Sequence, residues 1–404
     1  MSSRKTITSL FGGLILLFML WPSISWATTE DPPPPGGPSI ADEVVREQFQ
    51  QLQTEEIEDF WKEIQSTYDR YLPEESAPTL YDLVVARGEG EFSWKEVGRG
   101  FIRFFFHELL YNGKLIGTIV VLTVFSMILQ TLQTAFERNQ VSNVAYAIAY
   151  MVIIILAIQS FSVAVDSAKS AISQMIDFMV ALVPLILTLL ATMGNVGTVA
   201  LFHPLIVFMI HAVGTVIYTV VFPLFFFAAI LHIVSGLSQK YQVNQLAGFM
   251  QKIGMSLLGG MLTIFLGIIS VQGATAAVAD GVTLRTAKYV TGNFVPVVGR
   301  VFSDAADTVL GASLLVKNAV GITGVLLLLF ICAFPAIKIL SLAFIYNFSA
   351  ALLQPLGNSP IIGVLNVIGK TLIYIFAALA TVGLMFFLAI TIMITAGNIT
   401  VMMR

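Results

Sequence analysis

The chain has 404 residues, of which 57% are hydrophobic and only 11% are charged. Soluble domains carry about 25% charged residues, so this composition excludes an ordinary soluble protein and predicts a chain that lies mostly in lipid. The net charge of −3 conceals a partition, because residues 28–114 carry 18 Asp and Glu against 8 Lys and Arg, whereas residues 115–404 carry 6 against 11. An acidic segment therefore precedes a mildly basic membrane body.

The N-terminus has the layout of a secretory leader. Arg4 and Lys5 precede an apolar run from Leu10 to Trp21, and small residues follow up to Ala27. The run is shorter than the ~20 residues that a spanning helix needs, which favours a signal peptide at residues 1–27 over an uncleaved anchor. The proline-rich residues 28–40 then predict a stiff, solvated tether.

Residues 41–114 are predicted to form an acidic, helical, extracytoplasmic segment. Between Ile40 and Leu72, apolar residues recur at spacings of three and four, with acidic residues on the opposite face. This pattern predicts an amphipathic helix that packs on the membrane body or on a partner. Further on, aromatic residues alternate with Lys95, Arg99 and Arg103, which predicts a helix at the lipid headgroups.

The rest of the chain reads as an all-α, polytopic membrane protein with seven to nine crossings. Residues 115–172 would hold the leading transmembrane helices. The apolar run from Val199 to Leu237 is nearly twice a bilayer crossing, so we expect it to turn near Pro223. The other predicted spans are Leu115–Leu132, Val144–Val163, Ser173–Met193, Ile253–Val278, Lys317–Ile339, Leu340–Leu356 and Thr371–Ala396. The region from Ile339 to Ile362 could instead be re-entrant.

The sequence of the membrane body also predicts an internal duplication, with one repeat unit at residues 173–278 and the other at residues 288–397. Ordered matches at offsets of 107 to 115 residues pair Val183-Pro184 with Val295-Pro296, Ala212-Val213-Gly214 with Ala319-Val320-Gly321, Phe222-Pro223 with Phe334-Pro335, and Gly248 and Gly254 with Gly363 and Gly369. Duplicated membrane halves commonly enclose a path at their junction. The candidate path or kink positions are Pro223, Pro335, Gly292, Gly299, Arg300 and Asp304. The charges of the second unit favour an interfacial or re-entrant helix from Gly292 to Leu310.

Ionisable groups inside the predicted spans are candidates for function, because each costs about 2.5 to 3.5 kcal/mol on insertion scales. They are Asp177, His203, His211, His232, Lys317 and Lys338. Both lysines lie at predicted span ends, from which they can reach the headgroups. No carboxylate lies near the histidines in sequence, and the single Cys332 excludes an intrachain disulfide. We therefore expect no metal, no cofactor, no nucleic-acid binding and no enzymatic activity, with an intramembrane enzyme as the least favoured class.

Several motifs together resemble the stage III sporulation protein AE family of endospore-forming bacteria. They are the leader through Ala27, the acidic aromatic segment, Gly-Asn-Val-Gly at Gly194 to Gly197, Gly-Asn-Phe-Val-Pro-Val-Val-Gly at Gly292 to Gly299, Phe-Ser-Asp-Ala at Phe302 to Ala305, and the Ala-Gly-Asn that begins at Ala396. The resemblance covers essentially the whole chain.

This resemblance implies a multi-pass protein of the mother-cell membrane around the forespore. Its implied partners are the membrane proteins of the same sporulation operon and a forespore-side membrane protein, with a homo-oligomer as a further option. Together they would form a channel or secretion-like complex that supports forespore development and late forespore gene expression. The alternative from the residues alone is a self-sufficient permease for a small solute, which needs broken helices and polar groups at the bilayer midplane.

Overall fold

The structure is a computed structural model that describes residues 44–45, 47–48, 52, 54–72, 94–135, 140–237, 243–294, 298–356 and 360–402. The predicted signal peptide and tether lie outside these residues. Within the described ranges every long element is a helix, which confirms the all-α prediction. The α-helices are α3 (Glu55–Tyr68), α5 (Trp94–Tyr111), α6 (Gly113–Ala135), α7 (Gln140–Thr192), α8 (Val196–Val216), α9 (Phe222–Leu237), α10 (Asn244–Phe294), α11 (Val298–Leu353) and α12 (Pro360–Met402).

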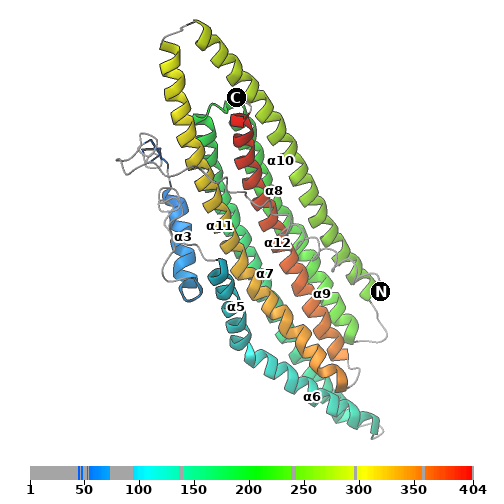
Figure 1. Cartoon of the computed structure of the whole chain (residues 1–404). Coiled ribbons are helices and arrows are strands. Elements are labelled where there is room, and N and C mark those ends of the chain that lie inside the picture. The colour runs from blue at the N-terminus through cyan, green and yellow to red at the C-terminus, as the bar shows by residue number, and fades with distance from the viewer. Residues whose placement is uncertain are drawn as a thin grey trace. The chain divides into compact units, whose positions relative to one another are not determined.

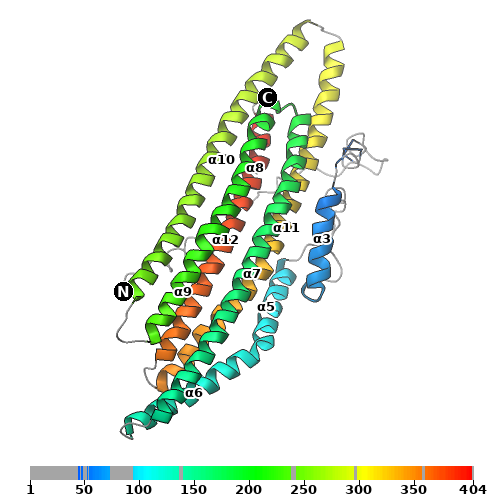
Figure 2. The same ribbon diagram turned by 180° about the vertical axis from the view of Figure 1, so that it is seen from behind.

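Five long columns of helix lie side by side: α7, α8 with α9, α10, α11 and α12 (Figures 1 and 2). Helix α12 is the central column, since it packs against α7, α9, α10 and α11. Many of its buried residues follow a seven-residue repeat of alternating three- and four-residue steps, which places one apolar seam along the helix from Leu365 to Met393. The seam consists of Leu365, Ile368, Leu372, Ile375, Leu379, Val382, Phe386, Ala389 and Met393.

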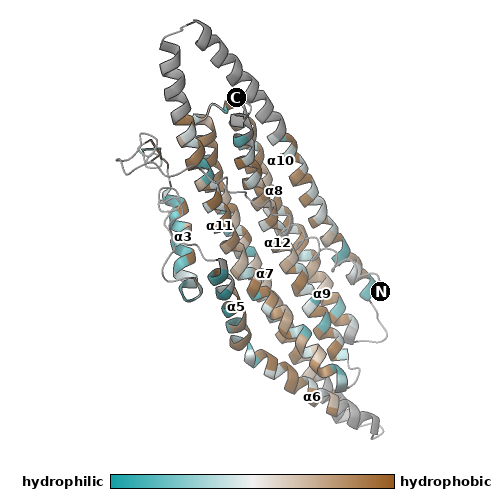
Figure 3. Ribbon diagram, in the orientation of Figure 1, coloured by the Kyte–Doolittle hydropathy of each residue, from teal (hydrophilic) through white to brown (hydrophobic). Residues whose placement is uncertain are grey.

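Hydrophobic residues cover these columns along most of their length, and five helical stretches are long and apolar enough to cross a membrane (Figure 3). They are Ile148–Thr192, Val196–Ser235, Asn244–Gly273, Val309–Leu353 and Pro360–Thr395. A sixth crossing results if α5 and α6, which meet at a bend of 46°, form one broken span. The described residues therefore do not confirm the predicted seven to nine crossings.

The difference arises because segments predicted to be separate helices are continuous. Val144–Val163 and Ser173–Met193 both belong to α7, and the two predicted spans between Lys317 and Leu356 merge into α11 and its short 3-10 extension. A helix of 45 residues is ~68 Å long at ~1.5 Å per residue, about twice the ~30 Å of a bilayer core. The polar residues between the predicted spans interrupt the hydropathy of the helix but not its hydrogen bonds.

Pro223 does not turn the chain, which corrects the prediction of two helices joined there. A π-helical turn, η2 (Ile217–Val221), links α8 to α9 within one continuous column. Proline removes one backbone donor and clashes with the carbonyl four residues earlier, which is Thr219 within the π-turn. The wider π-turn accommodates this lost hydrogen bond without a reversal of direction. Pro335 likewise lies inside the uninterrupted α11.

The turn between α7 and α8 depends on a glycine. Gly194 has a φ of 83°, in the left-handed region that residues with a Cβ rarely adopt. Its N–H donates to the Ala191 carbonyl, and the N–H of Asn195 donates to the Leu190 carbonyl at 3.0 Å. These are the two hydrogen bonds of a Schellman motif, so the family-like Gly-Asn-Val-Gly stretch ends one helix and begins the next.

The start of the second predicted repeat unit, residues 288–397, also differs from expectation. The single helix expected from Gly292 to Leu310 is divided: α10 ends at Phe294 and α11 begins at Val298. Gly292 is thus near the end of α10, whereas Gly299, Arg300 and Asp304 are in the first turns of α11. The side chains of these four residues lie outside the described part of the structure.

Candidate functional site

The acidic segment is fixed to the membrane body through one face of α3. Ile57 and Ile64 are buried at 1% and 6% exposure, and both lie on the face that the sequence predicted to be apolar. On the same face, Phe60 meets Phe178 of α7 edge to face, with ring centroids 5.5 Å apart. The prediction of an amphipathic helix is therefore confirmed, and its apolar face packs on the body of the same chain.

Six aromatic rings extend this contact to α5 and α11, and we call them the aromatic clasp: Tyr68, Tyr71, Phe101, Phe104, Phe330 and Phe334. Phe334 is at its centre, stacked on Tyr68 at 3.8 Å and edge-on to Phe104 at 5.2 Å. Gly100 of α5 allows the Tyr71 carbonyl to come so close that a Cβ at this position would collide with it. Aromatic pairs add about 0.5 to 1.5 kcal/mol each beyond burial, so the clasp holds three helices in one arrangement.

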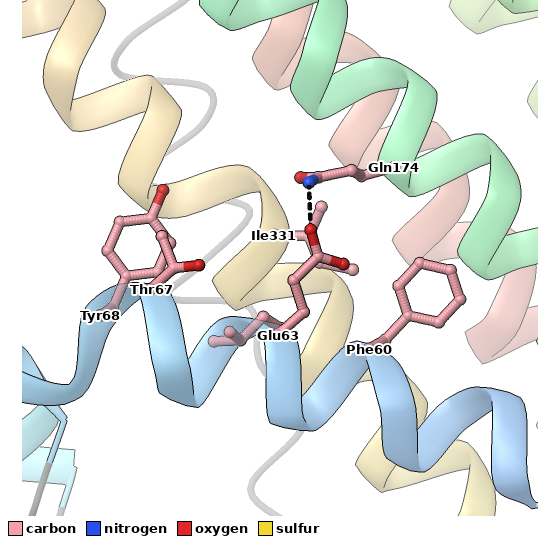
Figure 4. Close-up of a pocket in the computed structure, with 7 residues that line it drawn as sticks. Phe60, Glu63, Thr67, Tyr68, Gln174 and Ile331 are labelled. Atoms are coloured by element: carbon pink, nitrogen blue, oxygen red, sulfur yellow. Dashed lines mark hydrogen bonds between the residues drawn. The ribbon is translucent and has the colours of Figure 1, made fainter.

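A small pocket lies where α3 crosses α7 and α11 (Figure 4). Glu63 accepts a hydrogen bond from the Gln174 side-chain amide at 3.1 Å, and Tyr68 and Phe60 form part of the apolar lining. The cavity has a volume of about 50 Å³. Ligand pockets measure about 300 to 1,000 Å³, so this one can hold a water molecule or two but no solute.

The opposite face of α3 is charged and exposed. Glu55, Glu56, Asp59 and Lys62 lie there, and Lys62 donates to Asp59 at 3.2 Å. This is the single ion pair among the residues that the structure describes, and exposed pairs of this kind contribute little. Three carboxylates on adjacent turns would be costly against hydrocarbon, so this face requires water or a protein surface.

The polar residues predicted within the spans do not come together. Asp177 is exposed on α7, and His203 and His211 are exposed on α8. The His211 ring donates to the carbonyl of Val207 one turn earlier, at 2.9 Å. His232 of α9 bonds instead to the Asn244 side chain at the start of α10, at 3.0 Å. In the described ranges no group of three or more His, Cys, Asp or Glu residues could hold a metal ion.

The predicted location of Lys317 at a membrane surface is wrong. Lys317 was expected to reach the headgroups from a span end, but its side chain is fully buried between α11 and α12. Its Nζ donates to the Ile394 carbonyl at 2.8 Å and to Asn398 Oδ1 at 2.6 Å. The signal that could have revealed this is Asn398, a side-chain acceptor near the end of the last apolar run, although its distance in sequence conceals the contact.

By the length and composition of its helices, the chain is a polytopic α-helical membrane protein. The family model of stage III sporulation protein AE matches residues 76–397. The chain is also 52% identical to the stage III sporulation protein AE of Bacillus subtilis (strain 168) over 364 residues, which covers 90% of this chain and 91% of that protein. The chain therefore belongs to the stage III sporulation protein AE family. No solved structure matches it.

Proposed function

We propose that this protein is a membrane component of a trans-envelope channel or secretion-like complex that links mother cell and forespore. Membership of a sporulation family supports this assignment most directly. Within the structure, the supporting observation is α3, which the aromatic clasp holds against the bundle with its carboxylates turned outward. A fixed, charged face of this kind suits a protein partner, because it needs no further ordering before binding.

The partners in this proposal are membrane proteins of the same sporulation operon and a forespore-side membrane protein. The chain would sit in the mother-cell membrane around the forespore, with α3 and α5 in the intermembrane space. The predicted signal peptide supports this orientation, since a cleaved leader leaves the following segment outside the cytoplasm. N-terminal sequencing of the mature protein tests it: a chain that still begins at Met1 would contradict the proposed cleavage after Ala27.

The internal duplication remains part of the proposal. The matched glycines Gly254 and Gly369 each lie where a helix touches the column before it, Gly254 on Phe225 of α9 and Gly369 on Asn347 of α11. The hairpin of α8, α9 and α10 and the hairpin of α11 and α12 would then be corresponding halves. Such halves could build either a route or a platform for the partners.

The decisive experiment reverses the charge of the outward face of α3. The triple variant Glu55→Lys, Glu56→Lys, Asp59→Lys is introduced into a strain that lacks its own stage III sporulation protein AE. We expect a stably inserted protein that no longer co-purifies with the operon's membrane proteins and no longer supports sporulation. The matched control, Glu56→Asp with Asp59→Glu, keeps the charge and should support both.

Two results would count against the proposal. Full sporulation by the charge-reversed variant would show that this face meets no partner. Solute uptake by the purified protein alone in liposomes would favour the self-sufficient permease, whereas uptake that depends on co-expressed partners favours the complex.

A further inference from the structure

Among the Asp, Glu, Lys, Arg and His residues that the structure describes, Lys317 is the one whose side chain is fully buried. Its two hydrogen-bond partners, the Ile394 carbonyl and the Asn398 amide oxygen, are both neutral. No carboxylate contacts it within the part of the chain that the structure describes. A buried ammonium group needs strong solvation or an anion to compensate for the water it has lost.

Unsatisfied polar atoms gather at the same end of the bundle. Asn195, in the turn between α7 and α8, is only 1% exposed, and neither its amide nitrogen nor its amide oxygen has a partner among the described residues. Thr192, three residues earlier, lies 3.5 Å from Ser313 of α11, oxygen to oxygen. Ser313 precedes Lys317 by one helical turn and α7 is antiparallel to α11, so Asn195 and Lys317 lie on either side of this contact, each within about one turn of it along the bundle axis.

The facing side of the bundle contributes Gln272 of α10. Its amide nitrogen donates to the Leu201 carbonyl at 2.8 Å, whereas its oxygen is buried without a partner in the described residues. The next residue, Gly273, lies against the Ile392 side chain of α12. Ile392 precedes Ile394, whose carbonyl accepts from Lys317, by two residues. Asn318, adjacent to Lys317, has a third unsatisfied amide oxygen. The hydroxyl of Thr323, six residues further along α11, is also unsatisfied, so five of the eight buried unsatisfied side-chain atoms lie within about two turns of Lys317.

We propose that this end of the bundle encloses a hydrated chamber with Lys317 as its fixed positive charge, which admits small anions in preference to cations. A mixed set of donors and acceptors that do not satisfy one another is the pattern that ordered water satisfies. The single charge in that set is positive, so an anion compensates Lys317 and a cation is repelled. The chamber is a property of this chain alone and holds for a channel component and for a permease alike.

The test measures how fast buried cysteines react with charged thiol reagents in purified protein. In a Cys332→Ala background, Asn195→Cys and Gln272→Cys are each treated with an anionic sulfonatoethyl and a cationic trimethylammonioethyl methanethiosulfonate. Ser349→Cys is the matched dry control, since Ser349 is equally buried and unsatisfied but lies toward the far end of α11. Gln245→Cys is the exposed control, because Gln245 is exposed in the first turn of α10, at the very end of its apolar stretch.

We expect Asn195→Cys and Gln272→Cys to react and Ser349→Cys to remain unmodified. The ratio of the anionic to the cationic rate should be higher at the two reactive positions than at Gln245→Cys. Lys317→Gln retains N–H donors for Ile394 and Asn398 but removes the charge. For a separation on the order of 10 Å, the anion-to-cation rate ratio should then fall about fourfold at the dielectric constant of water, when the rates are measured at low ionic strength.

Each part of the proposal can fail separately. If Asn195→Cys and Gln272→Cys are as unreactive as Ser349→Cys, the chamber is dry and Lys317 only fastens the end of α12. If they react with no anionic preference over Gln245→Cys, the chamber is hydrated but does not select anions. If the preference is present and Lys317→Gln leaves it unchanged, Lys317 is not the charge that selects anions. The comparison with Gln245→Cys tests anion selection even if Lys317→Gln does not fold, and no outcome depends on transport or sporulation.

Discussion

Replacing Tyr68 by alanine should release α3 from the membrane body while the bundle stays folded. The Tyr68 ring stacks on Phe334 at 3.8 Å and meets Phe104 edge to face at 5.8 Å. Two aromatic pairs contribute about 1 to 3 kcal/mol, and loss of a large ring from a fully buried site costs about 3 to 5 kcal/mol. Because Tyr68 is only partly buried, we expect a loss of about 2 to 3 kcal/mol.

Hydrogen exchange of the α3 amides measures this loss directly. An isolated helix of 14 residues is marginal in water, so undocking exposes its amides to exchange. A loss of about 2 to 3 kcal/mol corresponds to exchange that is faster by about 30- to 150-fold, since every 1.4 kcal/mol is a factor of ten. Amides of α12, the central column, should be unaffected.

Tyr68→Phe is the matched control, because it keeps the ring and removes only the hydroxyl. We expect its α3 amides to exchange at the rate of the unmodified protein. If Tyr68→Ala leaves exchange in α3 unchanged, or accelerates α3 and α12 equally, the clasp is not what holds the segment in place.

Three further predictions concern other contacts of the same structure. Burial, together with the charges of Glu108 and Glu63, raises the pKa of Tyr68 above its usual value of 10.0. Because the docked state favours the neutral phenol, α3 docking should be intact below pH 10 and weaken as the pH rises beyond it. Hydrogen exchange should show no such pH-dependent loss in Tyr68→Phe. Gly324→Val should destabilise the bundle by about 1 to 3 kcal/mol, because even a Cβ there would lie 2.5 Å from Leu182, whereas Gly259→Ala meets nothing within 4 Å and should be neutral or stabilising in the same thermal-unfolding assay. Tyr346→Phe should lower stability by about 0.5 to 1.5 kcal/mol, because the buried hydroxyl donates to Ser160 Oγ at 2.8 Å; an unchanged midpoint would mean that this bond adds nothing to α7–α11 packing.

Much of the fold followed from the residue pattern. The apolar positions of α3 were correctly predicted to share one face, because a spacing of three and four residues places side chains on one side of any helix. The all-α class followed as well, since apolar runs of this length satisfy their backbone hydrogen bonds in lipid only as helices. The motif Gly194 to Gly197 lies at a real helix end, where Gly194 has the positive φ that the turn requires.

Where helices end, and which polar groups meet, depended on the tertiary structure. Hydropathy falls between Val163 and Ser173, but no residue there breaks a helix, so packing against α11 and α12 keeps α7 continuous. Pro223 predicted a turn of the chain, but the π-helical turn η2 accommodates the lost hydrogen bond and the column continues. Lys317 was expected at the headgroups because a sequence gives the local surroundings of a charge. Its burial is decided by the end of α12, 77 residues away, which only the folded bundle brings within hydrogen-bond distance.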